Sequence, residues 1–230
     1  LPASLIFILI YTYSSYRYGD KVVLSTTGAK EADPVTHRYL LDTVEGLSIA
    51  SGIPTPKTYV IENADLNAFA TGRNPENASI AVTTGLISTL NRQELEGVVA
   101  HEISHIKNRD ILFMTLVAVL VGLAAIVSHL ILRSMWFGGG RNRRDKGGGL
   151  IVIVFRKREY LADASGVSVT RYPEGLASAL EKIAEKNQGR IKVSDAVSHL
   201  FFVDPQKSSL DSLFATHPPI RERIKKLRQM

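Results

Sequence analysis

Apolar residues near the middle of the chain recur at the spacing of one face of a helix. The positions in this stripe are Leu95, Val98, Val99, Ile103 and Ile106. Spacings of three and four place them on one side of an α-helix, where they can face a core. Asn91, followed three residues later by Glu94, has the arrangement of a capping box at a helix start. We therefore expect a rigid, partly buried helix that begins near Asn91.

The rest of the pattern predicts a mixed domain in which helices outnumber strands. Residues 57–62 and 79–84 are short runs rich in Val, Ile, Thr and Tyr, which is typical of strands. Helices are expected over 34–50, over 173–186 and from Pro218 onward, because a proline can open a helix at its first position. The expected fold class is α+β, mostly helical with a small sheet.

One long segment stands apart from this pattern in its hydropathy. Residues 111–132 number 22 and contain no Asp, Glu, Lys or Arg. As a helix they would be about 33 Å long, enough to cross the apolar core of a bilayer. Residues 1–13 are also apolar but shorter, and the aromatic stretch that follows favours the end of a membrane helix over a cleaved signal peptide.

A loop rich in glycine and arginine, residues 138–149, follows the long apolar segment. If residues 111–132 cross the membrane, this basic loop lies on the side opposite residues 20–110, and its positive charge would conflict with the usual preference for positive charge on the cytoplasmic side if those residues are cytoplasmic. If the segment instead dips into the membrane or packs on the domain, that conflict disappears. Both arrangements stay open at the level of the sequence.

Composition excludes several classes of protein. The chain has no cysteine, so disulfides and thiolate metal sites are excluded. The formal net charge is +6, which suits an anionic membrane surface, and no nucleic-acid-binding module is visible. We therefore expect the lipid bilayer, and no nucleic acid, among the partners of this protein.

The predicted central helix carries a motif with specific metal chemistry, HExxH at residues 101–105. His101 and His105 lie one turn apart on the same face of a helix, where one Zn²⁺ can bind both at about 2.0–2.1 Å. Glu102 would then lie beside the ion, placed to take a proton from a water molecule there. The motif predicts a catalytic zinc site on a rigid element.

A catalytic zinc site usually takes three protein ligands, so a third is needed. Without cysteine it must be His, Asp or Glu. Downstream, Glu159 and Asp163 are four residues apart in a stretch with helical spacing, so they share one face. This spacing is typical of zinc peptidases in which the Glu binds the metal and the Asp orients a ligand histidine through a hydrogen bond.

Several motifs in order resemble the HtpX family of membrane-bound zinc metalloproteases. They are HEISHIKNRD at 101–110 and REYLADASG at 158–166, with further matches over 67–72, 80–86 and 215–219. The resemblance implies that His101, His105 and Glu159 are the zinc ligands, that Glu102 is the general base, and that Asp163 supports a ligand histidine. It implies one Zn²⁺ per chain and a zincin-like metalloprotease domain joined to transmembrane helices.

The resemblance also implies a place in the cell and a division of the chain. Members are multi-pass proteins of the cytoplasmic membrane whose catalytic domain faces the cytoplasm, and they cleave misfolded or damaged membrane proteins in quality control and stress response. By this analogy residues 1–19 are the remnant of a transmembrane helix and 20–110 the first part of the catalytic domain. Residues 111–155 are then a membrane insertion, and 156–230 the second part of the domain.

Two further sites follow from the resemblance. Asn67, Ala68 and Phe69 come after the first strand and are expected to border the substrate cleft. His217 precedes two prolines near the C-terminus and is expected near the metal, where it could donate to the developing oxyanion. A turn with a buried phenylalanine and a helix cap, respectively, are the competing interpretations.

The second predicted strand suggests how substrate is held. Over 79–84, Ile80 and Val82 alternate with Ala81 and Thr83, so one face can pack on the core. If the edge of this strand is free, Ala81, Val82 and Thr83 can pair with an extended peptide through backbone hydrogen bonds. The alternative is a central strand, paired on both sides.

The function expected from the sequence is a membrane-bound zinc endopeptidase. A CAAX-type prenyl protease shares the same ligand set, although the small number of hydrophobic segments argues against it. A non-catalytic membrane scaffold with a vestigial zinc site is the alternative outside enzymes. That alternative predicts loss of the base, whereas Glu102 is present.

Overall fold

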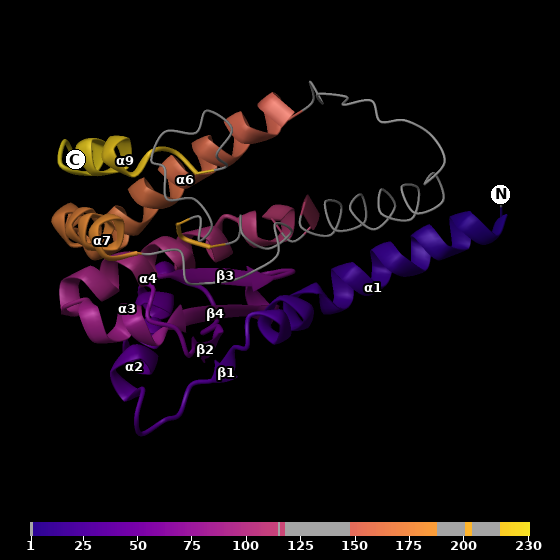
Figure 1. Ribbon diagram of the computed structural model, residues 1–230, viewed down its shortest axis with the longest axis horizontal. Coiled ribbons are helices and arrows are strands. Elements are labelled where there is room, and N and C mark those ends of the chain that lie inside the picture. The colour runs from indigo at the N-terminus through magenta and orange to yellow at the C-terminus, as the bar shows by residue number, and fades with distance from the viewer. Residues whose placement is uncertain (1, 115, 118–147, 188–200, 204–216) are drawn as a thin grey trace, which may run out of the picture.

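The structure is a computed structural model that describes residues 2–114, 116–117, 148–187, 201–203 and 217–230 (Figure 1). Its helices are α1 (Pro2–Thr26), α2 (Arg38–Ser51), α3 (Thr84–Thr89), α4 (Arg92–Lys107), α6 (Gly148–Thr170), α7 (Pro173–Lys186) and α9 (Ile220–Leu227). Its strands are β1 (Lys30–Glu31), β2 (Lys57–Ile61), β3 (Ala68–Gly72) and β4 (Ala78–Thr83), with a 3-10 turn at Pro75–Asn77. The predicted mixed fold, mostly helical with a small sheet, is confirmed for these residues.

The four strands form one mixed sheet in the order β1-β2-β4-β3. β4 pairs in parallel with β2, with Tyr59 opposite Ala81, and antiparallel with β3, with Phe69 opposite the same alanine. The prediction of a free edge along residues 79–84 is therefore wrong. Both sides of β4 are hydrogen-bonded to neighbouring strands, and the outer strand of the described sheet on that side is β3.

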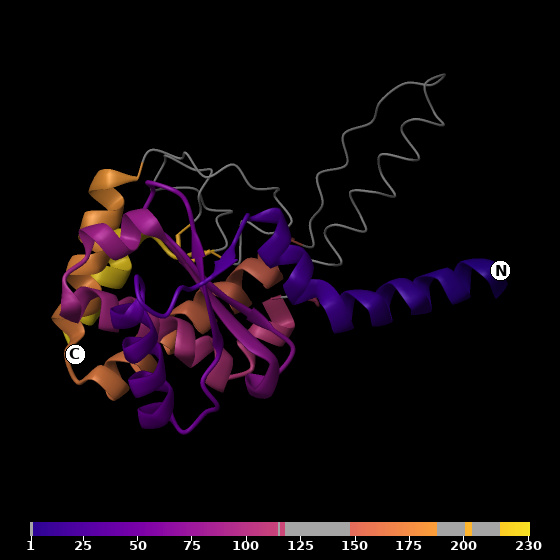
Figure 2. The same cartoon turned by 90° about the horizontal axis from the view of Figure 1, so that it is seen from below.

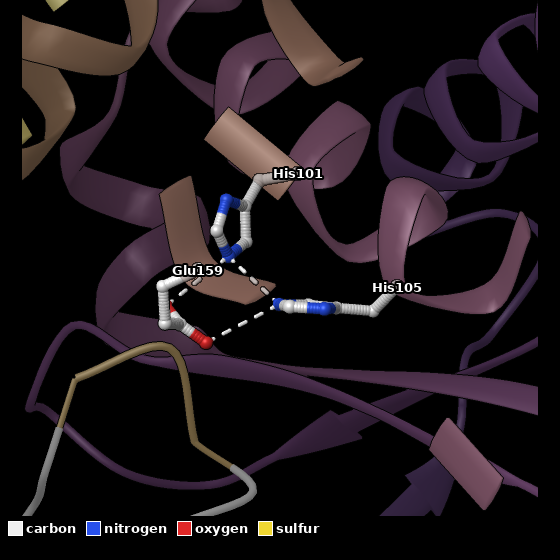
Figure 3. Close-up of side chains that lie close together, drawn as sticks. All are labelled: His101, His105 and Glu159. Atoms are coloured by element: carbon white, nitrogen blue, oxygen red, sulfur yellow. Dashed lines mark hydrogen bonds and ion pairs between the residues drawn. The ribbon is translucent and has the colours of Figure 1, made fainter. Parts of the chain in front are cut away.

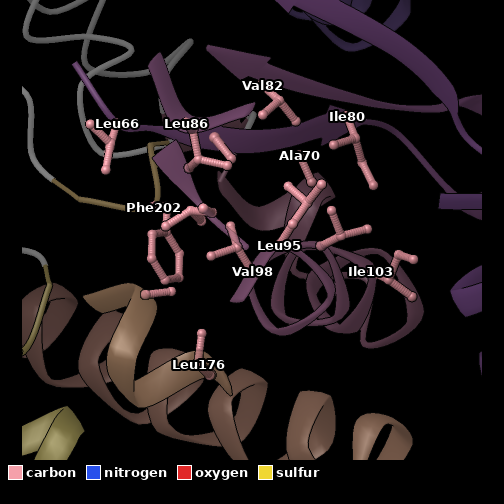
Figure 4. Packing of buried hydrophobic residues seen from close by; sticks show 14 of the residues in the cluster. Leu66, Ala70, Ile80, Val82, Leu86, Leu95, Val98, Ile103, Leu176 and Phe202 are labelled. Carbon is pink, nitrogen blue, oxygen red and sulfur yellow. The ribbon is translucent and has the colours of Figure 1, made fainter. Parts of the chain in front are cut away.

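Alternate side chains of the sheet enter two different hydrophobic clusters. Ala70, Ile80 and Val82 point into the larger one, which also contains apolar residues of α2, α4 and α7 (Figure 4). Phe69 and Ala81 belong to the smaller cluster, with apolar residues of α1 and α6. Both faces of β4 are covered, and its sequence is mostly apolar, as expected of a buried central strand.

Helix α4 is the element around which the domain is built. Its start is the predicted capping box, in which the Asn91 side chain accepts from the Glu94 backbone N–H and the Glu94 carboxylate accepts from the Asn91 N–H. The helix packs against α2, α6, α7 and β3. In Figure 1 it lies between the sheet on one side and α6, α7 and α9 on the other.

Two glycines allow helices to approach α4 closely. A Cβ at Gly97 would lie 2.7 Å from the backbone nitrogen of Leu176 in α7. A Cβ at Gly166 in α6 would lie 3.1 Å from the backbone nitrogen of His101. These contacts are closer than side chains normally permit, so the small residues set how near α7 and α6 come to the HExxH helix.

Two predicted helix starts shift in the structure. Residues 34–37 form turns, and α2 begins at Arg38 instead of Pro34. The Asp33 carboxylate accepts from the N–H groups of Val35 and Thr36, which holds these residues in a turn. The C-terminal helix α9 begins at Ile220, two residues after Pro218, while the helix over 173–186 is confirmed.

Helix α1 projects away from the rest of the molecule, with its N-terminal end far from the sheet (Figure 2). Among the described residues, no helix combines the length and the apolar character needed to cross a membrane. Most of the apolar segment 111–132 and of the loop 138–149 lies outside the described residues, so those predictions stay predictions. The expected division at 155–156 falls inside α6, which already begins at Gly148.

Candidate metal centre

Three side chains from two helices converge in the interior beside the sheet (Figure 3). His101 and His105 come from α4 and Glu159 from α6, and each is at most 3% exposed. Their ligand atoms all lie within 4.8 Å of one another, which makes them a candidate metal-binding group within the described part of the chain. The structure thus brings together the three ligands expected from the sequence.

The distances between these atoms fit a small tetrahedral ion. The two Nε2 atoms of the histidines are 3.1 Å apart, and Glu159 oxygens lie 3.4 Å from His105 Nε2 and 3.7 Å from His101 Nε2. Two ligands held at about 2.0–2.1 Å by a tetrahedral ion are roughly 3.3–3.4 Å apart. In addition, Glu159 Oε2 is buried and has no hydrogen-bond partner within the part of the chain that the structure describes. A bound cation would satisfy this oxygen.

The outer nitrogen of each histidine is held by a carboxylate. His101 Nδ1 lies 2.9 Å from Asp163, the contact that the sequence predicted. His105 Nδ1 lies 3.0 Å from Asp110, a residue that the sequence analysis did not single out. A carboxylate on Nδ1 stabilises the tautomer with its proton there, leaving the Nε2 lone pair free for a metal. Both histidines are therefore oriented as ligands.

Arg223 of α9 contacts two carboxylates of the site, those of Asp163 and Glu159. Its guanidinium donates two hydrogen bonds to Asp163, and its Nη1 lies 3.4 Å from Glu159 Oε2. It also lies over the ring of Phe202, which in turn packs edge-on against His101. A fully buried arginine is tolerated here because its charge is offset by these acidic neighbours.

The protonation states differ sharply between the two histidines. Burial lowers the pKa of His101 to about 4, so this ring is neutral at pH 7. Burial would also lower the pKa of His105, but its hydrogen bonds with Asp110 and Glu159 raise it to about 10. Without an ion, His105 therefore carries an extra proton that metal binding must release.

Glu102 lies beside the cluster and is separate from the three ligands. It is 2% exposed, and burial raises its pKa to about 7, while the backbone N–H of Ala70 in β3 partly offsets this effect. A carboxyl group with a pKa near the working pH can both accept and return a proton. Its position fits the role of general base expected from the motif.

His217 reaches the site from the segment before α9. Its Nδ1 lies 3.3 Å from Glu159 Oε2, yet neither ring nitrogen has a hydrogen bond with good geometry to any of the described residues. Burial would raise the pKa of Glu159, but the nearby His217 and His105 hold it well below its ordinary value. The ring is thus close to the metal group, as expected, with at least one nitrogen available to another partner.

The residues expected to border the cleft contact the chain's own segment 201–203. The Asn67 amide donates to the Val203 carbonyl and its oxygen accepts from the Val203 N–H. The Ala68 carbonyl accepts from the Phe202 N–H at 2.7 Å. Phe69 is fully buried and packs edge-on against Phe201. These backbone and side-chain contacts hold residues 201–203 along the edge of β3.

The expected substrate residues of β4 are also internal. Ala81, Val82 and Thr83 are fully buried. The Thr83 hydroxyl accepts from the backbone N–H groups of Asn67 and Leu86 and donates to the Asn67 carbonyl. These three residues of β4 contact other residues of the protein, because β4 lies between β2 and β3.

Two residues of the site escaped the sequence analysis. Asp110 enters the sequence analysis only as the last residue of the HEISHIKNRD motif, five residues after His105. Arg223 lies in the helix expected from Pro218 onward, and Ile220 and Leu227, three residues before it and four after it, are apolar. A charge at a core position of an amphipathic helix was the signal available for Arg223.

This combination of fold and site defines a metalloprotease that pairs an HExxH helix with a glutamate from a later helix. The chain belongs to peptidase family M48, whose family model matches residues 34–230. The resemblance to HtpX proteases and the expected metalloprotease activity are thereby confirmed.

Related protein sequences can be aligned with almost the whole of this chain. It is 46% identical to a protein named Protease HtpX homolog from Thermoanaerobacter pseudethanolicus, over 98% of this chain and 83% of that protein. A protein of the same name from Thermococcus sibiricus is 43% identical, over 97% of this chain and 84% of its own length. The crystal structure of S. mikatae Ste24p is similar in fold, with a TM-score of 0.59 at 16% identity. This chain covers 57% of that one.

Proposed function

We propose that this metalloprotease is a zinc endopeptidase of the cytoplasmic membrane that cleaves misfolded membrane proteins. The observation that carries the zinc assignment is the set of His101, His105 and Glu159, whose spacing suits a tetrahedral ion. Two imidazoles and one carboxylate are a donor set that Zn²⁺ favours. The absence of cysteine in the sequence fits a site of this kind.

Each residue of the site then has one task. Zinc, when bound, supplies the Lewis acidity that polarises the scissile carbonyl and a water molecule. The Glu102 carboxylate would take a proton from the attacking water molecule and later pass it to the leaving amine. Asp163 and Asp110 hold the two histidines in the metal-binding orientation, and His217 is placed to donate to the oxygen that becomes negative.

Membrane attachment is supported by the surface of α1. Ile6, Leu9, Ile10 and Tyr13 are between 56% and 67% exposed. Large apolar side chains in such number are unfavourable in water and suit contact with lipid or with other membrane segments. The resemblance to HtpX proteases supports a multi-pass arrangement with the catalytic domain facing the cytoplasm, and residues 111–155 as the insertion.

The substrate class that we propose follows from β3, the outer strand of the described sheet. The outward backbone groups of β3 include the Ala70 N–H, which already faces Glu102. Segment 201–203 already occupies this edge at Ala68, so an extended peptide would have to pair beyond it, near Ala70, where its backbone would lie next to the base; such pairing demands little of the sequence. Misfolded proteins offer extended chain, so they are the substrates that we assign to this site.

The test compares wild-type protein with Glu102→Gln. Both should bind about one Zn²⁺ per chain by metal analysis, whereas Glu102→Gln should lose about 10²–10⁴-fold in cleavage of casein or of an unfolded membrane protein. Cleavage by Glu102→Gln at the wild-type rate would contradict the mechanism. Stoichiometric zinc in Glu159→Ala would show that another residue is the third ligand.

A CAAX-type prenyl protease is the second candidate, because it shares the ligand set of two histidines and a glutamate found at this site. The two functions differ in what they cut. A CAAX-type enzyme should prefer a prenylated C-terminal peptide over casein, and a quality-control protease should show the reverse order of kcat/KM. A preference for the prenylated peptide would replace the function proposed here.

A further inference from the structure

We propose that Arg158 is a positioning residue for the metal centre, acting on His105 through Asp110. The observation is a chain of contacts that starts at a ligand and ends on the neighbouring helix. Asp110 Oδ2 is 3.0 Å from His105 Nδ1, and its other oxygen, Oδ1, accepts a hydrogen bond from Arg158 Nη1. The Asp110 carboxylate is therefore shared between a metal ligand and a cation.

The Asp110 carboxylate needs that cation in order to stay in place. Its side chain is 2% exposed, so burial removes most of the water that would otherwise solvate its charge. The described structure gives it two partners, His105 and Arg158. Leaving a buried carboxylate with only one of two partners is costly. Without Arg158 the carboxylate is free to turn toward solvent and release the imidazole.

Arg158 is itself held in a defined position. Its guanidinium lies over the ring of Phe113, with the central carbon 4.7 Å from the ring centroid. Phe113 packs against Phe155 of α6, with ring centroids 5.4 Å apart. A planar guanidinium that both stacks on a ring and donates to a carboxylate has fewer orientations open to it than an exposed lysine.

The ion pair also joins the two halves of the metal centre. Asp110 follows α4, which carries the two histidines, and Arg158 is adjacent to the ligand Glu159 in α6. The two paired residues are 48 positions apart in sequence. By joining them, the pair fixes α6 beside the end of α4 at the point where Glu159 lies 3.4 Å from His105.

The inference rests on the proposed zinc site and predicts a specific pattern of zinc affinities. Arg158→Gln should weaken zinc binding about 10-fold, and Asp110→Ala about 10–100-fold, as for other groups that support a metal ligand. Because Arg158 acts through Asp110, Arg158→Gln should cause no further loss in the Asp110→Ala background. Arg158→Lys should restore only part of the affinity, since it keeps the positive charge but loses the planar guanidinium that stacks on Phe113.

The experiment measures the zinc Kd of the full chain in detergent by competition with a chromophoric chelator. The visible spectrum of the Co²⁺-substituted protein reports the geometry of the site independently of activity. Lys157→Gln is the matched control, because Lys157 is the exposed neighbour of Arg158 on the same helix. Its Kd and spectrum should equal those of wild type, whereas Arg158→Gln should change both.

The inference is overturned if Arg158→Gln keeps the wild-type Kd and spectrum, or if its effect adds in full to that of Asp110→Ala. Should Asp110→Ala fail to fold in chelator, Asp110→Asn takes its place, because it keeps an oxygen for His105 but no charge for Arg158. A wild-type chain that binds no zinc would instead contradict the proposed function. The two failures are thus distinct.

Discussion

Arg223 holds the carboxylate of Asp163 with two hydrogen bonds, from Nε to Oδ2 at 2.9 Å and from Nη2 to Oδ1 at 2.7 Å. Both side chains are at most 3% exposed, and the same carboxylate lies 2.9 Å from His101 Nδ1. The arginine thus fixes the group that orients a metal ligand, although it comes from the last described helix of the chain. Stability and metal binding therefore depend on one buried ion pair.

Arg223→Met should lower the free energy of unfolding by about 3–5 kcal/mol, because it leaves the buried Asp163 carboxylate without its cation. Chemical denaturation in the presence of chelator measures this loss free of any contribution from metal. Replacing both partners, as Arg223→Met with Asp163→Leu, should cost less than Arg223→Met alone. Equal stability of wild type and Arg223→Met would show that the pair is energetically unimportant.

Val82→Pro should prevent stable folding, because proline removes a backbone N–H and adds a ring in a strand paired on both sides. Val82→Ala at the same position keeps the N–H and removes only two methyl groups from the core. Circular dichroism and size-exclusion chromatography should show folded Val82→Ala but not folded Val82→Pro. A folded Val82→Pro with a raised KM would restore the free-edge interpretation of β4.

Gly97→Ala and Gly46→Ala should have opposite effects on thermal stability. At Gly97 a new methyl group would lie 2.7 Å from the Leu176 nitrogen, and overpacking against backbone costs about 1–3 kcal/mol. At Gly46, which is exposed in α2, no atom lies within 4 Å, and alanine should gain up to about 1 kcal/mol in helix propensity. Thermal unfolding should therefore give a lower Tm for Gly97→Ala and a higher Tm for Gly46→Ala.

Glu94 should contribute stability that is lost in acid. Burial alone would raise its pKa, but hydrogen bonds from Lys182, Asn91 and Ser178 lower the pKa below the ordinary 4.5. A carboxylate whose pKa is lower in the folded state stabilises the fold fully above the unfolded value and loses this effect as pH falls through the folded value. Glu94→Gln should thus be about 1–3 kcal/mol less stable at pH 7, and this difference should shrink below pH 4.5.

Urea denaturation of metal-free protein at several pH values measures the Glu94 effect. Glu96→Gln is the control, because Glu96 lies one turn from Arg92 in an exposed pair that is screened by solvent. It should leave the unfolding free energy close to wild type at every pH. A Glu94→Gln deficit that stays constant into acid would mean that the charge of Glu94 is not what stabilises the helix start.

Local spacing was enough to predict α4 and its pair of histidines, because a helix places residues four apart on one face whatever surrounds it. Glu159 as the third candidate ligand followed from the resemblance to HtpX proteases. The place of β4 in the sheet could not be predicted in the same way. Its parallel pairing with β2 joins segments about 20 residues apart, and the sequence of one strand does not state which neighbours it has. The apolar character of both faces was compatible with either arrangement.

The roles of Asp110 and Arg223 could not be predicted from the sequence for the same reason. Asp110 and Arg223 carry ordinary charged side chains, and their roles depend on which carboxylate or histidine the fold brings to them. No spacing rule connects Arg223 with His101, which lies 122 positions earlier. Contacts of this range are set by packing of α6 on α4 and of α9 on α7 and α6, which the sequence pattern indicates only as a general amphipathic character.

The long separation between His101 and Arg223 has a consequence during synthesis of the protein. The ribosome adds about 5–20 residues per second, so it needs roughly 6–25 s to pass over the 122 positions between them. For that time the HExxH helix of the nascent chain lacks Arg223, and over the last 60 positions Asp163 is present without the arginine that holds it. The order of the residues thus leaves the metal-binding group without its last buried partner until residue 223 has been made.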